Sequence, residues 1–234
     1  MGFPSDASLG PRPVSETETH TRSLFIIRTY NHLLAAVLAF TGIEVALFKT
    51  GLADRIAITM LSTSWLLVLG AFIVVSWIAS SVAHTVQSKL AQYAALAAYV
   101  VAEALVFVPI LWFVEKKAHD VLQPAIIVTV AGFLGLTIIG FMTRKDFSFL
   151  GGLLRWVGVC ALLAIGGGLL FNFTLGTWFS VGMIAFAGAA ILYNTSNVLL
   201  HYSEDRYIAA SLQLFASVVM LLWYVLRLFL RLRD

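Results

Sequence analysis

Two acidic residues lie inside long apolar runs of the sequence, where a charge is costly. Glu103 stands near the middle of the run at 90–114, and Glu44 lies toward the end of the run at 27–48. A charge at bilayer depth costs at least about 2.5–3.5 kcal/mol, so each acid must be neutral, paired or in contact with water. Glu44 is close enough to the end of its run to reach the headgroups. Glu103 is the candidate for carrying a cation or proton, against the alternative of a neutral acid hydrogen-bonded inside the protein, and Arg155 is its partner if the third and fifth runs touch.

Two later runs carry polar side chains at helical spacing. Asn194, Asn197 and His201 occupy positions i, i+3 and i+7 of the run at 177–200, which places them on one helix face. The run at 207–230 carries its own polar face, made of Gln213, Ser217, Tyr224 and Arg227. The two faces form either a hydrogen-bonded contact between helices or a hydrated path for ions or protons. His201 stands at the end of its run and is expected at the membrane interface.

The composition predicts an all-α integral membrane protein. The 234 residues are 60% hydrophobic and 12% charged, with a mean hydropathy of +0.93. About 20 apolar residues cross the hydrocarbon layer as a helix, and backbone groups in lipid must be satisfied within the segment. The predicted spans are 27–48, 57–82, 90–114, 122–143, 148–171, 177–200 and 207–230. We therefore expect a polar disordered tail at residues 1–23 and one seven-transmembrane-helix domain at residues 24–234.

Several classes of function are not expected for this composition. The net charge of +3 is small and unclustered, so the chain lacks the basic face of a nucleic-acid binder. The five histidines are scattered and the single cysteine, Cys160, has no partner, so no metal site, cofactor site or catalytic constellation is predicted. We expect a protein that is not an enzyme and whose first partner is the lipid bilayer.

Three stretches late in the chain carry a resemblance to a known family. They are "RKDFSFLGGLL", "ILYNTSNVLLHY" and "SEDRYIAASLQLFASVVMLLWYVLRLF". Together with "FIIRTYNHLLAAVLAFTGIEVALF" and "LAAYVVAEALVFVPIL", they make the chain similar to the Bax inhibitor-1 family, the transmembrane Bax-inhibitor-motif proteins. The resemblance covers nearly everything after the N-terminal tail. It implies a seven-helix bundle in which the last helix is central, surrounded by the other six, with the N-terminus in the cytosol.

The resemblance also implies a function and a site. Family members are linked to calcium leak across the endoplasmic reticulum or bacterial inner membrane, to stress and death suppression, and in some bacteria to modulation of a membrane protease. Those studied as leaks use a pair of aspartates as sensor. The matching positions here are Asn194 and Ser217, which cannot titrate. We expect this amide and hydroxyl to hold the sixth and seventh spans together without a pH switch.

Two functional hypotheses follow. The first is a slow cation leak, for calcium or protons, whose path is lined by Glu103, Asn194, Asn197, Gln213 and Ser217. The second is a non-conducting regulator that binds another membrane protein, such as a quality-control protease or a stress-response partner. The short loops favour the bacterial inner membrane, with the endoplasmic reticulum membrane as the alternative location.

Overall fold

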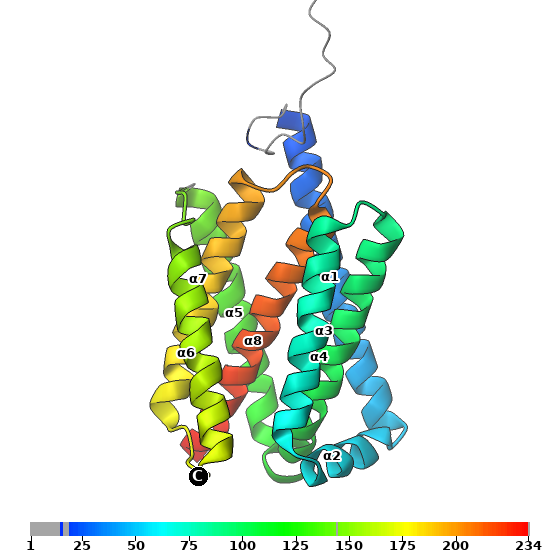
Figure 1. Cartoon of the computed structure of the whole chain (residues 1–234), viewed down its shortest axis with the longest axis vertical. Coiled ribbons are helices and arrows are strands. Elements are labelled where there is room, and N and C mark those ends of the chain that lie inside the picture. The colour runs from blue at the N-terminus through cyan, green and yellow to red at the C-terminus, as the bar shows by residue number, and fades with distance from the viewer. Residues whose placement is uncertain (1–14, 16–18, 144, 234) are drawn as a thin grey trace, which may run out of the picture.

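The computed structural model describes residue 15, residues 19–143 and residues 145–233, and the elements within them are eight helices and no strand (Figure 1). The helices are α1 (Thr19–Lys49), α2 (Leu52–Ser62), α3 (Trp65–Thr85), α4 (Lys89–Lys117), α5 (His119–Thr143), α6 (Leu150–Leu170), α7 (Thr177–Leu200) and α8 (Tyr207–Arg233). All except α2 are long and apolar enough to cross a membrane. The prediction of an all-α membrane protein with seven spanning helices is confirmed.

The expected second span, 57–82, is wrong at its start. Its first residues belong to α2, which ends at Ser62, and the spanning helix α3 begins only at Trp65. With 11 residues α2 is about 16 Å long, about half the hydrocarbon thickness. Gly51 makes the turn between α1 and α2 with φ +74°, a conformation that favours glycine. Ala53 and Ala57 then pack α2 against α4 at Val108.

The N-terminal boundary also differs from the expected one. The helix α1 begins at Thr19, ahead of the expected domain start at residue 24. The rest of the expected tail, apart from Ser15, lies outside the described residues.

The last helix is the centre of the bundle. α8 packs against α1, α3, α4, α5 and α7, and its fully buried residues include Ile208, Leu214, Phe215 and Leu226. α6 packs mainly on α7 and reaches α3, so it is the most peripheral spanning helix. The expectation of a central last helix is met, with five helices packed directly around it.

The short connections gather at two ends of the bundle. One end, called here the α7–α8 loop end, carries the connections α3–α4, α5–α6 and α7–α8, while the other, the α2 end, carries α2 and the C-terminus (Figure 1). Asp54 of α2 accepts a hydrogen bond from Trp112 Nε1 at 2.8 Å and pairs with Lys116 at 3.4 Å. These two partners hold the pKa of the Asp54 carboxyl below its usual value, the Trp112 hydrogen bond contributing most. This ties α2 to α4 at the membrane surface.

Candidate functional site

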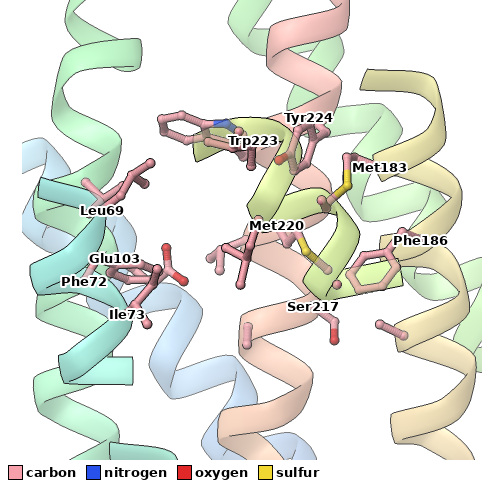
Figure 2. A pocket seen from close by; sticks show the side chains of 18 of the residues that line it. Leu69, Phe72, Ile73, Glu103, Met183, Phe186, Ser217, Met220, Trp223 and Tyr224 are labelled. Atoms are coloured by element: carbon pink, nitrogen blue, oxygen red, sulfur yellow. The ribbon is translucent and has the colours of Figure 1, made fainter. Parts of the chain in front are cut away.

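The Glu103 carboxyl group lies at a cavity of about 480 Å³ between five helices. Its walls come from α3, α4, α6, α7 and α8, and most of the lining side chains are apolar, among them Phe72, Phe186 and Met220. Figure 2 shows Glu103 turned from α4 toward the side of the cavity formed by α8. We call this space the Glu103 cavity. An acid in mid-span thus lines a cavity between helices, which also reaches the exposed side chains Ile73 of α3 and Leu162 of α6.

The Glu103 side chain is held from its own helix. Glu103 is 7% exposed, and Tyr99 Oη, one turn earlier on α4, donates a hydrogen bond to Glu103 Oε1 at 2.8 Å. The i, i+4 spacing makes this contact a property of the sequence. Among the described residues no cation lies in ionic contact with the carboxylate. Arg227 of α8 lines the same cavity, so a cation and an acid share one space without pairing.

A polar layer joins α7, α8 and α3. Asn194 Nδ2 donates to Ser217 Oγ at 2.9 Å and to the Gln213 carbonyl at 3.2 Å. Ser217 Oγ donates to the same carbonyl at 3.0 Å, and Gln213 Nε2 donates to Ser80 Oγ of α3 at 3.2 Å. The expected contact between Asn194 and Ser217 is present. We call Ser80, Asn194, Gln213 and Ser217 the polar layer.

The polar layer lies at one end of the Glu103 cavity. On α3, α4 and α7, the lining residues nearest the α7–α8 loop end are Ile73, Tyr99 and Ala190. Asn194 and Ser80 lie farther along their helices toward that same end. On α8, Gln213 and Ser217 face both the cavity and the layer. A chain of satisfied hydrogen bonds therefore closes the cavity toward the α7–α8 loop end.

Tyr224 of the predicted polar face also lines the cavity, whereas three other predicted polar residues lie apart from it. Arg155 is exposed on α6 and does not line it. Asn197 is half-buried on α7 and also lies outside the lining. His201 is exposed at the end of α7, as expected, and pairs with Asp146 at 3.4 Å. The Ser148 backbone N–H, which donates to Asp146, is the main cause of the lowered pKa of that carboxyl.

Glu44 was expected to reach the lipid headgroups, and the structure shows that it does not, because its side chain is buried in the bundle. It is 6% exposed, and both carboxylate oxygens are buried without a hydrogen-bond partner among the described residues. Its side chain lines a second cavity of about 390 Å³ between α1, α4, α5 and α8, called here the Glu44 cavity. The sequence position allowed the side chain to extend to the interface, but the packing of α1 against α4 and α8 keeps it inside.

An aromatic wall separates the two cavities. Phe40 and Phe215 line the Glu44 cavity, and Tyr99 and Phe107 line the Glu103 cavity. Phe40 meets Phe107 edge-to-face at 5.1 Å, and Phe215 meets Tyr99 at 6.1 Å between centroids. Aromatic pairs at these separations pack favourably. The acids Glu44 and Glu103 thus occupy separate compartments.

Two residues of these sites were not anticipated from the sequence. Ser80 supplies the α3 contact of the polar layer, and Thr129 of α5 lines the Glu44 cavity with a buried hydroxyl that has no partner. A serine or threonine in an apolar helix commonly bonds its own backbone one turn earlier. The residue types alone therefore carried no signal for either role.

The site chemistry fits a mobile cation or proton better than a resident metal. Within the described ranges no group of three or more His, Cys, Asp or Glu side chains could hold a metal ion. The Glu103 cavity offers a single carboxylate, with amide and hydroxyl groups beside it. One carboxylate can accept a proton or pair transiently with a cation, whereas tight divalent coordination needs six or more oxygen ligands.

Comparisons with known proteins place the chain in a family. The family model described as "Inhibitor of apoptosis-promoting Bax1" matches residues 22–234. An uncharacterized protein of Pseudomonas aeruginosa is 34% identical over 111 residues, 47% of this chain and 50% of the relative. The "Golgi anti-apoptotic protein" of vaccinia virus strain Lister is 30% identical over 57% of this chain and 55% of its own length. "Bax inhibitor 1" of Schizosaccharomyces pombe is 27% identical over 92% and 79%.

The chain spans about half the length of the first two of these relatives. No solved structure matches the chain.

Proposed function

Because this chain belongs to the Bax inhibitor family of integral membrane proteins, we propose that it is a slow leak for calcium or protons, with Glu103 as the group that receives the ion. The observation that carries this proposal is a mid-span carboxylate at a cavity of about 480 Å³ between helices, which continues to the polar face of α8. Intramembrane acids that face a cavity commonly mark ion or proton routes.

The proposed mechanism divides the route into a vestibule and a closure. The vestibule is the Glu103 cavity, where the carboxylate attracts a cation and the Tyr99 hydroxyl orients it. The closure is the polar layer, whose hydrogen bonds between Asn194, Ser217 and Gln213 must break before an ion passes. Interhelical hydrogen bonds in membranes are individually weak, about 0.6 kcal/mol on average. The bonds from Asn194 to Ser217 and Gln213 and from Gln213 to Ser80 must break together, so only a minor fraction of molecules is open, which makes the leak slow.

The closure carries no titratable group, unlike the aspartate pair that the family resemblance implies. An amide and a hydroxyl keep the contact between α7 and α8 but bind no proton. The proposed leak therefore depends on pH through Glu103 alone within its lining. A bacterial inner membrane is the proposed location, a proposal supported by the Pseudomonas relative.

The test is flux into liposomes that hold the purified protein. Calcium and proton uptake are measured across roughly pH 5 to 8 for the wild type and for Glu103→Gln, which keeps the shape and removes the charge. Flux above that of empty liposomes, lost in Glu103→Gln, is the expected result. Glu204→Gln is the matched control, because Glu204 is an exposed loop residue that receives the same chemical change. Flux absent from the wild type, or retained in Glu103→Gln, would overturn the proposal.

The second candidate is a non-conducting regulator that binds another membrane protein. It is favoured by the peripheral position of α6, whose outward side chains include Trp156, Leu163 and Leu170. Because α6 packs mainly on α7 and α3, most of its surface is available to pack against a helix of another protein. Cys160, exposed on α6 and the only cysteine of the sequence, allows a direct test. Crosslinking from Cys160 to one discrete membrane protein, with no flux, would favour this function.

A further inference from the structure

The Glu44 cavity opens sideways between α1 and α5. The exposed lining residues at its mouth are Thr41 and Val45 of α1, with Ile126 and Val130 of α5; a fifth exposed lining residue, Glu115, lies near the C-terminal end of α4. These residues lie within spanning helices, so the mouth faces the acyl chains. The floor is formed by α8, with Phe215 and Leu222. A molecule dissolved in the bilayer can therefore enter without crossing the membrane surface.

The interior of this cavity contains three buried oxygen atoms without a partner. They are the two carboxylate oxygens of Glu44 and the hydroxyl oxygen of Thr129, which is 2% exposed. A buried polar atom with no hydrogen bond costs about 1–3 kcal/mol. Buried polar groups in native proteins usually have a partner, and Glu44 is the one acid among the buried side chains without a partner in the described part of the chain. A ligand with hydrogen-bond donors would satisfy these three atoms.

The charge of the lining selects the ligand. The lining residues include a second acid, Glu115, and no Lys, Arg or His. Glu115 is exposed and lies 3.3 Å from His119 Nε2, whereas Glu44 is buried, so Glu44 is the acid left for a ligand inside the cavity. The complementary group is a cation that also carries N–H donors. A primary ammonium has three such donors, as many as the unpartnered oxygens.

We propose that the Glu44 cavity binds a membrane-dissolved long-chain primary amine, with the ammonium group at Glu44 and Thr129 and the chain leaving between α1 and α5. The volume of about 390 Å³ and the mainly apolar lining suit the head and first part of such a chain. The aromatic wall separates this site from the Glu103 cavity. The amine site and the proposed ion route thus use different acids, and each can be tested without the other.

The experiment is competitive photolabelling in zwitterionic liposomes without an ion gradient. A photoactivatable long-chain primary amine is the probe, and labelled peptides are mapped by mass spectrometry. We expect labelling of α1 and α5 at the mouth, competed by hexadecylamine and not by hexadecan-1-ol, which has one donor and no charge. Hexadecyltrimethylammonium, which is charged but has no N–H donor, should compete about tenfold less well.

Two variants and a control complete the test. Glu44→Gln should weaken labelling about tenfold or more, because the charge-assisted contact is lost. Val130→Trp alters only an exposed residue of the mouth and should block entry while the fold persists. Glu204→Gln should label as the wild type does. Labelling that is unchanged by Glu44→Gln, spread over all outward-facing helices, or competed equally by the alcohol would overturn the proposal.

Discussion

Glu103 and Glu44 are almost equally buried, 7% and 6% exposed, and each lines a cavity that α4 and α8 help to form, yet their polar surroundings differ. Glu103 accepts a hydrogen bond from Tyr99 and shares its cavity with the polar face of α8. Glu44 has no partner and lies in a cavity that opens between two helices toward the acyl chains. The position of an acid within a spanning helix therefore does not determine its role. What matters is whether the bundle supplies a partner and where the adjoining cavity leads.

The largest effect is expected when each acid is replaced by leucine. Glu44→Leu removes two unpartnered oxygens and should raise the free energy of unfolding by about 1–3 kcal/mol. Glu103→Leu leaves the Tyr99 hydroxyl without its acceptor and should lower the free energy of unfolding by about 1–3 kcal/mol. Thermal denaturation of the purified variants in a neutral detergent measures both. Shifts of the same sign would remove the distinction between the two acids.

Tyr99→Phe is the control for this pair. It should destabilise the wild type but recover stability in Glu103→Leu, because there it removes the hydroxyl that has lost its acceptor.

A smaller effect is expected at the polar layer, which closes only one of the two cavities. Asn194→Leu removes the donor to Ser217 and Gln213 and should lower the free energy of unfolding by about 0.6–1.7 kcal/mol. If the layer is the closure, the same variant should raise calcium or proton flux in liposomes. Asn197→Leu, one turn away and outside the cavity lining, is the matched control. Equal flux in Asn194→Leu and the wild type would show that the layer closes nothing.

The smallest effect is expected at Asp54. This acid lies outside the spanning helices and contacts Trp112 and Lys116. Its pKa is lowered by the hydrogen bond from Trp112 and by Lys116. The folded state therefore favours the carboxylate, and the attachment of α2 is strongest above the unfolded pKa of about 3.9. The attachment of α2 weakens as the pH falls through the lower pKa that Asp54 has in the folded state. Hydrogen exchange of the α2 amides should accelerate there in the wild type and show no such step in Asp54→Asn.

The predictions that held were those based on composition and local spacing. Seven spans follow from apolar runs of sufficient length. Glu103 was singled out as a mid-span acid, and the structure adds a hydrogen bond from Tyr99, which its i, i+4 spacing permits. The contact between Asn194 and Ser217 was expected because polar groups on two adjacent antiparallel helices form hydrogen bonds with each other when they are buried.

The predictions that failed depended on how helices are placed around one another. Glu44 was expected at the headgroups, but the arrangement of α1, α4, α5 and α8 encloses it. The predicted start of the second span was wrong because residues 57–62 belong to the separate helix α2. That helix is stabilised by contacts with Val108 and Trp112 of α4, which are distant in the sequence. Arg155 lies outside the Glu103 cavity because its side chain is exposed, although Gly158 and Ala161 of the same helix line the cavity.

The sequence by itself determined the membrane environment, the number of spans and the residues that could carry a charge through them. These properties depend on side-chain transfer energies and on contacts within one helix, which are local. Only the tertiary structure decided that α8 is enclosed by five helices, that Glu103 and Glu44 face different cavities and that Ser80 completes the polar layer. Apolar helices offer many nearly equivalent faces to one another, and the choice among them depends on the packing of the whole bundle at once.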